Sequence, residues 1–570
     1  MQPVDFTTLT ASCSELRTLM IPSRLEQVYQ RDRHTIAIAL RTMKQRSWLE
    51  ISWHIQAARI CIGNPPPRTP DTFTFSQQLV HQLGGLALVA IEAIAPWERA
   101  IDLQFARRPG ESALYHLYVE IMGKYSNVIL ANASNIIITA AHQVNQQQTS
   151  VRPILTGQPY EKPPSLTGAI PSLSESQQRW QERLSLVPGA IKRQVFKSYR
   201  GISSSLIESM LIAASLDPES TTDITAEDWQ RLFQRWTEWL QALETQNFHP
   251  GWTSNGYTVL GWGTVKPVQN IQELLNQYYT DQLNQQVFAQ LRHQLSQKLN
   301  NILEKLRQKA NTFLTRLQQS DRADEYRQKA DLLMAHLQQW RVGMKEIILN
   351  DFETGANVAI ALEPDKNAVQ NAQNLYKQNQ KLKRARTAVE PLLASVQAEI
   401  AYLEQVEAAI AQIDSYQSSE DLQTLEEIRE ELVQQRYLED PEYKSRSATE
   451  TSSNFHRYRT PSGFEVLIGR NNRQNDQLTF RVAGDYDLWF HAQEIPGSHV
   501  LLRLEPGAAP ESADLQYTAN LAAYYSRGRQ SDQVPVVYTQ PKHVYKPKGA
   551  KPGIAIYKQE RIIWGKPHVL

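Results

Sequence analysis

Residues 299–317 read LNNILEKLRQKANTFLTRL, and apolar side chains recur in this stretch every seven positions. Two series carry the repeat: Leu299, Leu306 and Phe313, and Leu303, Ala310 and Leu317. Residues at this spacing share one seam of a long helix, which packs against a partner helix. Further along the chain, Val396, Leu403 and Ile410 repeat at the same interval and supply that partner.

A short β-hairpin is expected between these two helical runs. Ile347–Asn350 and Val358–Leu362 are apolar segments with Gly355 between them. We therefore predict an antiparallel coiled coil over residues 270–435, with a small tip around 341–365. The alternative is a globular helical bundle. The scarcity of aromatic residues within the repeats argues against it.

The segments before the coiled coil predict two further domains. Residues 1–172 mix strand-like and helical runs, and residues 181–265 predict short helices punctuated by Gly189 and Gly201, with a polar linker from 165 to about 180 between the two domains. The expected strands are Thr35–Leu40, Trp48–Trp53, Asn127–Leu130 and Asn135–Ile138, and the expected helices are Ile191–Phe196, Ser203–Ala214 and Asp228–Leu243.

The C-terminal part changes charge along its length. Residues 419–442 hold nine acidic residues against two arginines, which predicts a solvated helix face and then a linker. From Phe455 the pattern is β-rich, and the alternation of Leu478, Phe480 and Val482 predicts a strand. The last thirty residues carry seven Lys/Arg and one acid, with Tyr545, Tyr557 and Trp564 interleaved.

Composition excludes several classes of protein. The formal net charge is +1, and two cysteines form neither a disulfide framework nor a zinc motif. The N-terminus has no signal-peptide pattern, and the longest apolar stretch, Leu83–Trp97, contains Glu92 and is too short to cross a bilayer. We expect a soluble cytosolic protein.

The residues that could carry chemistry favour binding over catalysis. Lys542, Lys546, Lys548 and Lys551 beside Tyr545 suit RNA, because cations neutralise phosphates and aromatic rings stack on unpaired bases. A solubilising basic tail is the alternative. His491 and His499 flank a Pro-Gly-Ser turn and could form a catalytic or metal pair, but no HExxH or CxxC motif accompanies them. Structural histidines are favoured, and we predict no catalytic residue, metal or cofactor.

Five blocks in the C-terminal part occur in an order that resembles the signature of the NFACT RNA-binding domain. The blocks are Gly469–Asp476, Asp487–Ala492, Ile495–Val500, Leu521–Ser526 and Lys546–Gly553. Upstream, Arg24–Gln30 and Glu120–Asn127 resemble the N-terminal NFACT domain, as does Asp5. Gly201–Ser203 resembles its helix-hairpin-helix-like segment, and Asn371–Lys377 resembles the second coiled-coil arm.

The resemblance to the RqcH-type NFACT family, formerly called fibronectin-binding protein A, implies an α+β multidomain fold. It implies an α/β N-terminal NFACT domain at 1–172, a helix-hairpin-helix-like helical domain at 181–265, an antiparallel coiled coil at 270–435 and a β-rich RNA-binding domain at 450–565. Such proteins bind the large ribosomal subunit that carries obstructed peptidyl-tRNA. They recruit charged tRNA, alanyl-tRNA in bacteria, for mRNA-independent tailing of the nascent chain. The ribosome forms the peptide bonds, and no membrane is involved.

The same resemblance implies two sets of site residues. The tRNA-binding set is Glu98, Arg99, Glu120, Met122 and Lys124. The set for ribosomal and other RNA is Arg470, Asn471, Asn475, Asp476, Trp489, His491, His499, Lys546, Lys548 and Lys551. From the residues alone, Glu98-Arg99 at a strand entrance is either a surface ion pair or an arginine presented to nucleic acid.

Two departures from the family pattern affect the tRNA site. Glu98 replaces the usual aspartate and is one methylene longer, and Leu79-Val80-His81 replaces Leu-Arg-Lys. These changes lengthen the side chain that carries one carboxylate and remove two cations, so they affect the expected recruitment of tRNA and its selectivity.

Two other functions remain as alternatives. A DNA glycosylase or lyase of the MutM type needs a free N-terminal proline, whereas Pro3 follows Met1 and Gln2. A fibronectin-binding adhesin would need a secretion signal and an anchor, and neither is recognisable in the sequence.

Overall fold

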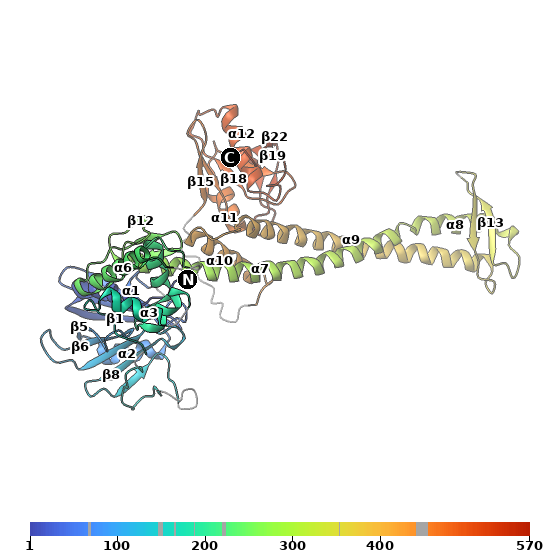
Figure 1. The fold of residues 1–570 in the computed structure, drawn as a ribbon. Coiled ribbons are helices and arrows are strands. Elements are labelled where there is room, and N and C mark those ends of the chain that lie inside the picture. The colour runs from blue at the N-terminus through green and yellow to red at the C-terminus, as the bar shows by residue number, and fades with distance from the viewer. Residues whose placement is uncertain are drawn as a thin grey trace. The chain divides into compact units, whose positions relative to one another are not determined.

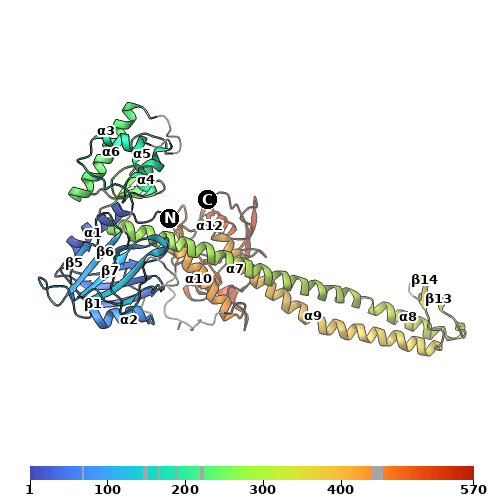
Figure 2. The same ribbon diagram turned by 60° about the horizontal axis from the view of Figure 1, so that its bottom comes forward.

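The computed structural model describes residues 1–569 except 67–69, 146–151, 165–166, 187–188, 219–223, 353 and 440–453 (Figures 1 and 2). The predicted start of the last domain at residue 450 therefore lies outside the described residues. The chain divides into two units, Met1–Leu283 and Asn284–Leu570. None of the described helices combines the length and the apolar composition that a membrane span requires.

The first unit is built on one antiparallel sheet. Its strands are β1 (Ser23–Asp32), β2 (Thr35–Arg41), β3 (Arg46–Ser52), β4 (Arg59–Gly63), β5 (Ala87–Ala93), β6 (Ala100–Ala106), β7 (Tyr115–Glu120), β8 (Asn127–Asn132) and β9 (Ile137–Ala140). They lie in the order β4-β3-β2-β1-β5-β6-β7-β8-β9. Three of the four strands predicted here are confirmed, and the fourth, predicted at Asn135–Ile138, begins only at Ile137 because Asn135 lies in the preceding turn with φ 61°. Every pairing is antiparallel, so the expected α/β arrangement is corrected to α+β. Hairpins join the neighbouring strands on either side of the β1–β5 pair, and the connection from β4 to β5 contains the helix α2 (Thr74–Leu83).

Helices α1 (Phe6–Met20) and α2 (Thr74–Leu83) pack against the core of this sheet through apolar side chains such as Leu16 and Leu79. Asp5 caps α1 by accepting a hydrogen bond from the backbone N–H of Thr8 at 2.8 Å. The other oxygen of the Asp5 carboxyl accepts from the Ser203 hydroxyl at 2.6 Å. The cap of α1 is therefore also a link to the helical segment that follows the sheet.

That helical segment holds α3 (Gln177–Ser185), α4 (Ile191–Ser198), α5 (Ser204–Ala213) and α6 (Ala226–Thr245). The three helices predicted here are confirmed. Their core is rich in tryptophan, and the rings of Trp180, Trp236 and Trp239 are fully buried. A small sheet of β10 (Gly251–Thr253), β11 (Gly256–Thr258) and β12 (Lys266–Pro267) follows.

The heptad segments form long helices that pack together. They are α7 (Ile271–Ser320), which begins in the first unit, α8 (Ala323–Ala335) and α9 (Ala368–Gln412). Within the second unit, Leu299 and Leu303 of α7 share a core with Leu403 and Ile410 of α9. The hairpin of β13 (Glu346–Asn350) and β14 (Asn357–Ala361) lies between α8 and α9 in the chain, as predicted (Figure 1). The extended antiparallel arm excludes the globular bundle.

The rest of the second unit is a β-rich module that follows α10 (Ser419–Gln434). Its elements are β15 (His456–Arg459), β16 (Glu465–Ile468), α11 (Asn472–Gln477), β17 (Leu488–Ala492), β18 (Val500–Leu502), α12 (Ser512–Tyr524), β19 (Val534–Thr539), β20 (Val544–Tyr545), β21 (Ile556–Tyr557) and β22 (Arg561–Gly565). Six strands form one sheet in the order β15-β16-β18-β17-β19-β22. Buried apolar clusters lie on both of its faces.

The strand predicted from Leu478, Phe480 and Val482 is wrong. Residues Leu478–Val482 form a π-helical turn that continues α11. Leu478 and Thr479 are buried and Phe480 is exposed, which fits one face of a helix. Alternation over five residues is too short to separate the two periods.

The fold predicts a strict need for glycine at position 201. Gly201 has φ +76°, and a Cβ built there would lie 2.6 Å from Cε3 of Trp97. Gly263 has φ +68°, and a Cβ built there would have no atom within 4 Å. Gly263→Ala therefore measures the cost of the backbone conformation alone. We expect Gly263→Ala to cost about 1 kcal/mol and Gly201→Ala clearly more, measured by urea unfolding. Equal losses would show that the Trp97 contact is unimportant.

Candidate nucleic-acid interface

The register of β6 and β7 brings the predicted tRNA-binding residues together where β6 begins and β7 ends, a part of the large sheet that is called its Arg99 edge below. Ala100 pairs with Glu120, and the backbone N–H of Ile121 donates to the carbonyl of Arg99 at 2.8 Å. Residues 98–99, just before β6, therefore lie beside residues 120–124 at the end of β7. Positions about twenty residues apart in sequence become neighbours because the strands are antiparallel.

The turn before β6 is held by Trp97. This residue has φ 63°, and its ring stacks on Phe6 with centroids 4.9 Å apart and meets Trp239 edge-on at 5.7 Å. Glu98 is buried, whereas Arg99 is partly exposed. Of the predicted acid–arginine pair, Arg99 is thus the member that reaches solvent, and Glu98 belongs to the support beneath it.

Glu120 is fully buried in an ion pair. Its two carboxylate oxygens accept hydrogen bonds from the Arg152 guanidinium at 2.8 and 2.6 Å, and Tyr160 donates to the same carboxylate at 2.8 Å. This fork geometry is the strongest arrangement for an arginine and a carboxylate. Glu120 therefore fixes the segment around Arg152 and Tyr160 to the end of β7, and its side chain does not face solvent.

The turn after β7 presents a cation and an aromatic ring. Met122 precedes the 3₁₀ turn η1 (Gly123–Tyr125), and its backbone N–H donates to the Ser126 hydroxyl at 2.9 Å. Lys124 is exposed with Nζ 5.0 Å from the centroid of the Tyr125 ring, and Tyr125 is 71% exposed. Tyr125 was not among the predicted site residues, although its position next to Lys124 was a signal for it.

The two positions that replace the family's cations lie on α2. Val80 is 46% exposed, and His81 is exposed with Nδ1 3.2 Å from the amide nitrogen of Gln82. An apolar side chain and an imidazole therefore occupy the two positions at which the family resemblance led us to expect cations. The electrostatic attraction for phosphate at these two positions is correspondingly smaller.

Removing Arg152 should expose the cost of the buried Glu120 carboxylate. We expect Arg152→Leu to lower the free energy of unfolding by about 3–5 kcal/mol, because it leaves a buried charge unpaired. The double variant Glu120→Gln/Arg152→Leu should recover much of that loss, since the neutral amide still accepts from Tyr160. Urea unfolding of both variants measures the difference. Equal destabilisation of the single and double variants would contradict this role for the ion pair.

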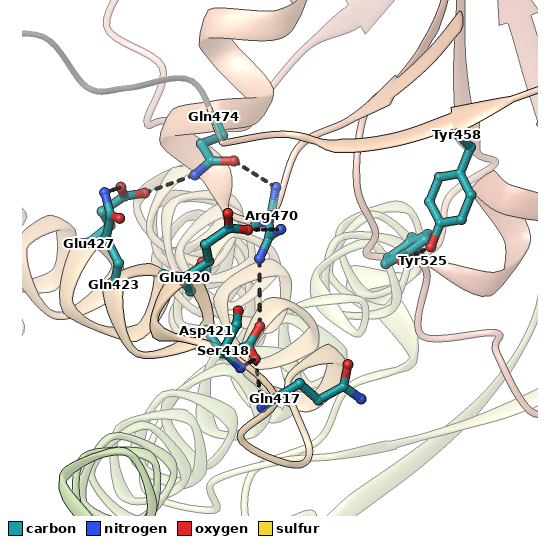
Figure 3. A network of polar contacts seen from close by, with 11 residues as sticks. Gln417, Ser418, Glu420, Asp421, Gln423, Glu427, Tyr458, Arg470, Gln474 and Tyr525 are labelled. Atoms are coloured by element: carbon teal, nitrogen blue, oxygen red, sulfur yellow. Dashed lines mark hydrogen bonds and ion pairs between the residues drawn. The ribbon is translucent and has the colours of Figure 1, made fainter. Parts of the chain in front are cut away.

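The acidic helix α10 packs against the start of the β-rich module (Figure 3). Arg470 lies 2.6 Å from Glu420 and 3.6 Å from Asp421, and the side-chain amides of Asn471 and Gln474 donate to Glu427 at 2.7 and 3.0 Å. The acidic face of α10 comprises Glu420, Asp421, Glu427, Glu430 and Glu431. The prediction that this face is solvated is wrong for Glu427 and Glu431, which are buried beneath amide donors of the segment Asn471–Gln474, whereas the Glu420 side chain is 46% exposed.

Four of the predicted RNA-binding residues belong to this contact or to the turn behind it. Arg470 and Asn471 face α10, as described above. Asn475 is buried, and its side-chain oxygen accepts from the backbone N–H of His499 at 3.0 Å. Asp476 pairs with Lys546 and accepts from the backbone N–H of Gly553 at 3.0 Å. These side chains organise the module from inside.

The predicted aromatic group is also largely internal. Trp489 is buried, and its indole N–H donates to the Thr479 hydroxyl at 3.0 Å. His499 is buried with Nδ1 2.7 Å from the same hydroxyl. Burial lowers the pKa of His491 to about 4 and the pKa of His499 to about 3. Both imidazoles are therefore neutral at pH 7, and neither offers a positive charge to phosphate.

The three predicted lysines differ in their surroundings. Lys546 pairs with Asp476, while the ammonium of Lys551 lies 4.6 Å from the ring of Tyr402 and 4.5 Å from the ring of Tyr437. Burial lowers the pKa of Lys551. Lys548 is exposed. Among the other exposed cations and rings of the module are Lys542, Tyr545, Lys558, Arg561 and Trp564.

The described residues include no group of three or more His, Cys, Asp or Glu side chains placed to hold a metal ion. What the geometry offers is a surface for polyanions. Lys124 with Tyr125 in the first unit and Lys558 with Tyr545 in the second, 5.8 Å apart, each combine a cation with a ring. Such pairs suit a phosphate beside an unpaired base.

The buried Glu431 predicts a pH dependence of stability. Burial raises its pKa, while Tyr402 at 2.7 Å and Asn472 at 3.2 Å donate to one carboxylate oxygen. A carboxyl whose pKa is raised on folding contributes most below its unfolded pKa, and the contribution falls as pH rises. Glu431→Gln keeps an oxygen for both donors, so its melting temperature relative to the unsubstituted protein should rise from pH 4 to pH 7. A constant difference across that range would refute the effect.

The fold and the surface indicate a class of multidomain protein that binds polyanions. In the order of the chain it has a sheet with helices, an antiparallel helical arm and a β-rich module with exposed cations and rings. The family model for the NFACT N-terminal and middle domains matches residues 5–451, and the model for the NFACT RNA-binding domain matches residues 454–558. The chain belongs to the NFACT family.

Two relatives match the amino-acid sequence of this chain over nearly its whole length. The chain is 29% identical over 565 residues to the Rqc2 homolog RqcH of Bacillus subtilis (strain 168), covering 97% of this chain and 96% of the relative. It is 30% identical over 566 residues to the Rqc2 homolog RqcH of Streptococcus suis (strain 05ZYH33), covering 96% and 95%. The solved C-terminal part of the fibronectin/fibrinogen-binding protein of Streptococcus suis has 31% identity and a TM-score of 0.38, covering 49% of this chain and 95% of that one.

Proposed function

We propose that the chain is an RNA-binding adaptor in ribosome quality control and works in the cytoplasm. The match to both NFACT models and the similarity to Rqc2 homologs over 97% of the chain support this role. In this proposal the ribosome itself forms peptide bonds, and the protein contributes binding and orientation.

The observation that carries the proposal is the pairing of exposed cations with exposed rings in both units. Lys124 lies over Tyr125 in the first unit, and Lys558 lies near Tyr545 in the second. Lysine neutralises backbone phosphate, and an aromatic ring stacks on an unpaired base at about 1–3 kcal/mol per base. Folded RNA with exposed loops, such as tRNA and ribosomal RNA, offers both groups to one protein.

The finer proposal divides these contacts between two RNAs. The C-terminal module and the arm bind the large ribosomal subunit that carries obstructed peptidyl-tRNA. The Arg99 edge, where Lys124 also lies, receives charged tRNA, alanyl-tRNA by resemblance, for mRNA-independent tailing of the stalled chain. Because Val80 and His81 stand where the family has two cations, we expect tRNA binding by this chain to depend less steeply on salt than in relatives that keep both.

The arginine at the strand entrance provides the test. Arg99→Ala should reduce the tRNA that co-purifies with the protein, because it removes the partly exposed cation of this edge. Co-sedimentation with large ribosomal subunits should remain, since that contact rests on the other unit. Arg108→Ala is the matched control, because Arg108 is an exposed arginine just beyond the opposite end of the same strand.

Sequencing and quantifying the bound RNA would decide the outcome. Unchanged tRNA recovery by Arg99→Ala would remove Arg99 from the site. Failure of the unsubstituted protein to bind large subunits or tRNA at low salt would remove the whole proposal.

A further inference from the structure

A cavity of about 290 Å³ lies between the C-terminal sheet and α9 within the second unit. Rings of Trp489, His491 and Tyr557 line it from the module, and Gln405 lines it from the arm. The volume equals that of about ten water molecules in the liquid, which is room for one small planar ring system. The cavity is too small for a folded peptide segment.

Two buried polar atoms on the wall of this cavity have no hydrogen-bond partner in the part of the chain that the structure describes. They are Nε2 of His491 and Oε1 of Gln405. A buried polar atom without a partner is costly, so its presence in two lining residues indicates a guest that supplies hydrogen bonds. Burial lowers the pKa of His491 to about 4, so its ring is neutral and one of its nitrogens is an acceptor.

The charges around the cavity disfavour a phosphate inside it. No lysine or arginine is among its described lining residues, whereas Glu404 and Glu494 are, so a phosphate would be repelled. Glu404 is already engaged, because it pairs with Arg307 at 2.7 Å and lies 3.8 Å from Arg527. The two unpartnered acceptors therefore call for a guest that brings N–H donors into the cavity.

The aromatic walls specify the shape of that guest. The rings of Trp489 and His491 are nearly parallel, at 13° with centroids 5.7 Å apart, and Tyr557 lies 5.7 Å from Trp489 at 39°. Rings 5.7 Å apart leave no room for a base between them, so a base would stack on the partly exposed ring of His491 or of Tyr557.

We propose that this cavity binds a single unpaired RNA nucleobase that carries an exocyclic amino group, with Gln405 and His491 as its hydrogen-bond partners. The inference rests on the proposed RNA-binding function and adds a base-selective subsite to it. Adenine, cytosine and guanine each offer an amino group, whereas uracil does not. The backbone phosphates of the same RNA stay outside, beside the exposed lysines of the module.

Binding of mononucleotides to the full-length protein tests the cavity directly. Calorimetric titration with adenosine, cytidine and uridine monophosphates should give affinities for the first two that exceed the third by about fivefold, the effect of one neutral hydrogen bond. His491→Phe, which keeps a ring of similar size, and Gln405→Leu should each remove most of that preference.

A blocking variant checks the location without disturbing the core. Ala401 lies on the arm, lines the cavity and is exposed, so Ala401→Trp should fill the mouth and reduce nucleotide binding at least about tenfold. Ala394→Trp is the control, because Ala394 is exposed on the same helix two turns away and does not line the cavity.

The outcomes separate this inference from the function on which it rests. Equal binding of all three nucleotides, or binding that Ala401→Trp leaves unchanged, would overturn the nucleobase site. Co-sedimentation with large subunits together with no saturable nucleotide binding would also overturn it while leaving the adaptor role intact. Nucleotide binding without any affinity for ribosomal particles or tRNA would instead refute the adaptor role.

Discussion

The helix α10 is buried on two sides, and these two contacts join the arm of the second unit to its β-rich module. One side of this helix places Leu425, Ile428 and Leu432 in the core of the arm. The other side presents its acidic face to Arg470 and its neighbours in the module. Buried carboxylates cost several kcal/mol unless charges and hydrogen-bond donors compensate them. These charges and donors compensate the acidic face in the observed register, so the contact joins the arm to the module.

Local periodicity explains which parts of the fold could be predicted. The heptads, the tip hairpin and the four predicted strands of the nine-stranded sheet are each defined by a pattern within a few residues, so each carries its own signal. The packing of α10 on Arg470 joins segments fifty residues apart, and a run of acids is equally typical of a solvated face. The turn at Leu478–Val482 was missed because five alternating residues do not separate a strand from a helix.

The same distinction applies to the candidate site. The family blocks predicted segments at β6 and β7, and the register of these strands brings Arg99 and Glu120 together with Lys124 at the same strand ends. Sequence could not tell which of them face solvent, because burial depends on partners such as Arg152 that lie elsewhere in the chain. In the module, Asn475 and His499 hold the surface in place from below, while Lys548 lies on it. Some motif residues are thus buried and support the surface, whereas others are exposed and can contact a ligand.

The length of α9 turns small movements near its C-terminal end into large ones at its far end. From Tyr402 to its start at Ala368 the helix spans about 51 Å at about 1.5 Å per residue, so a tilt of about 5° displaces its distant end by about 4 Å. The leverage begins where Tyr402, Leu403 and Val406 meet α10 in one buried cluster. The packing of this cluster therefore limits how far the distant end of the helix can swing.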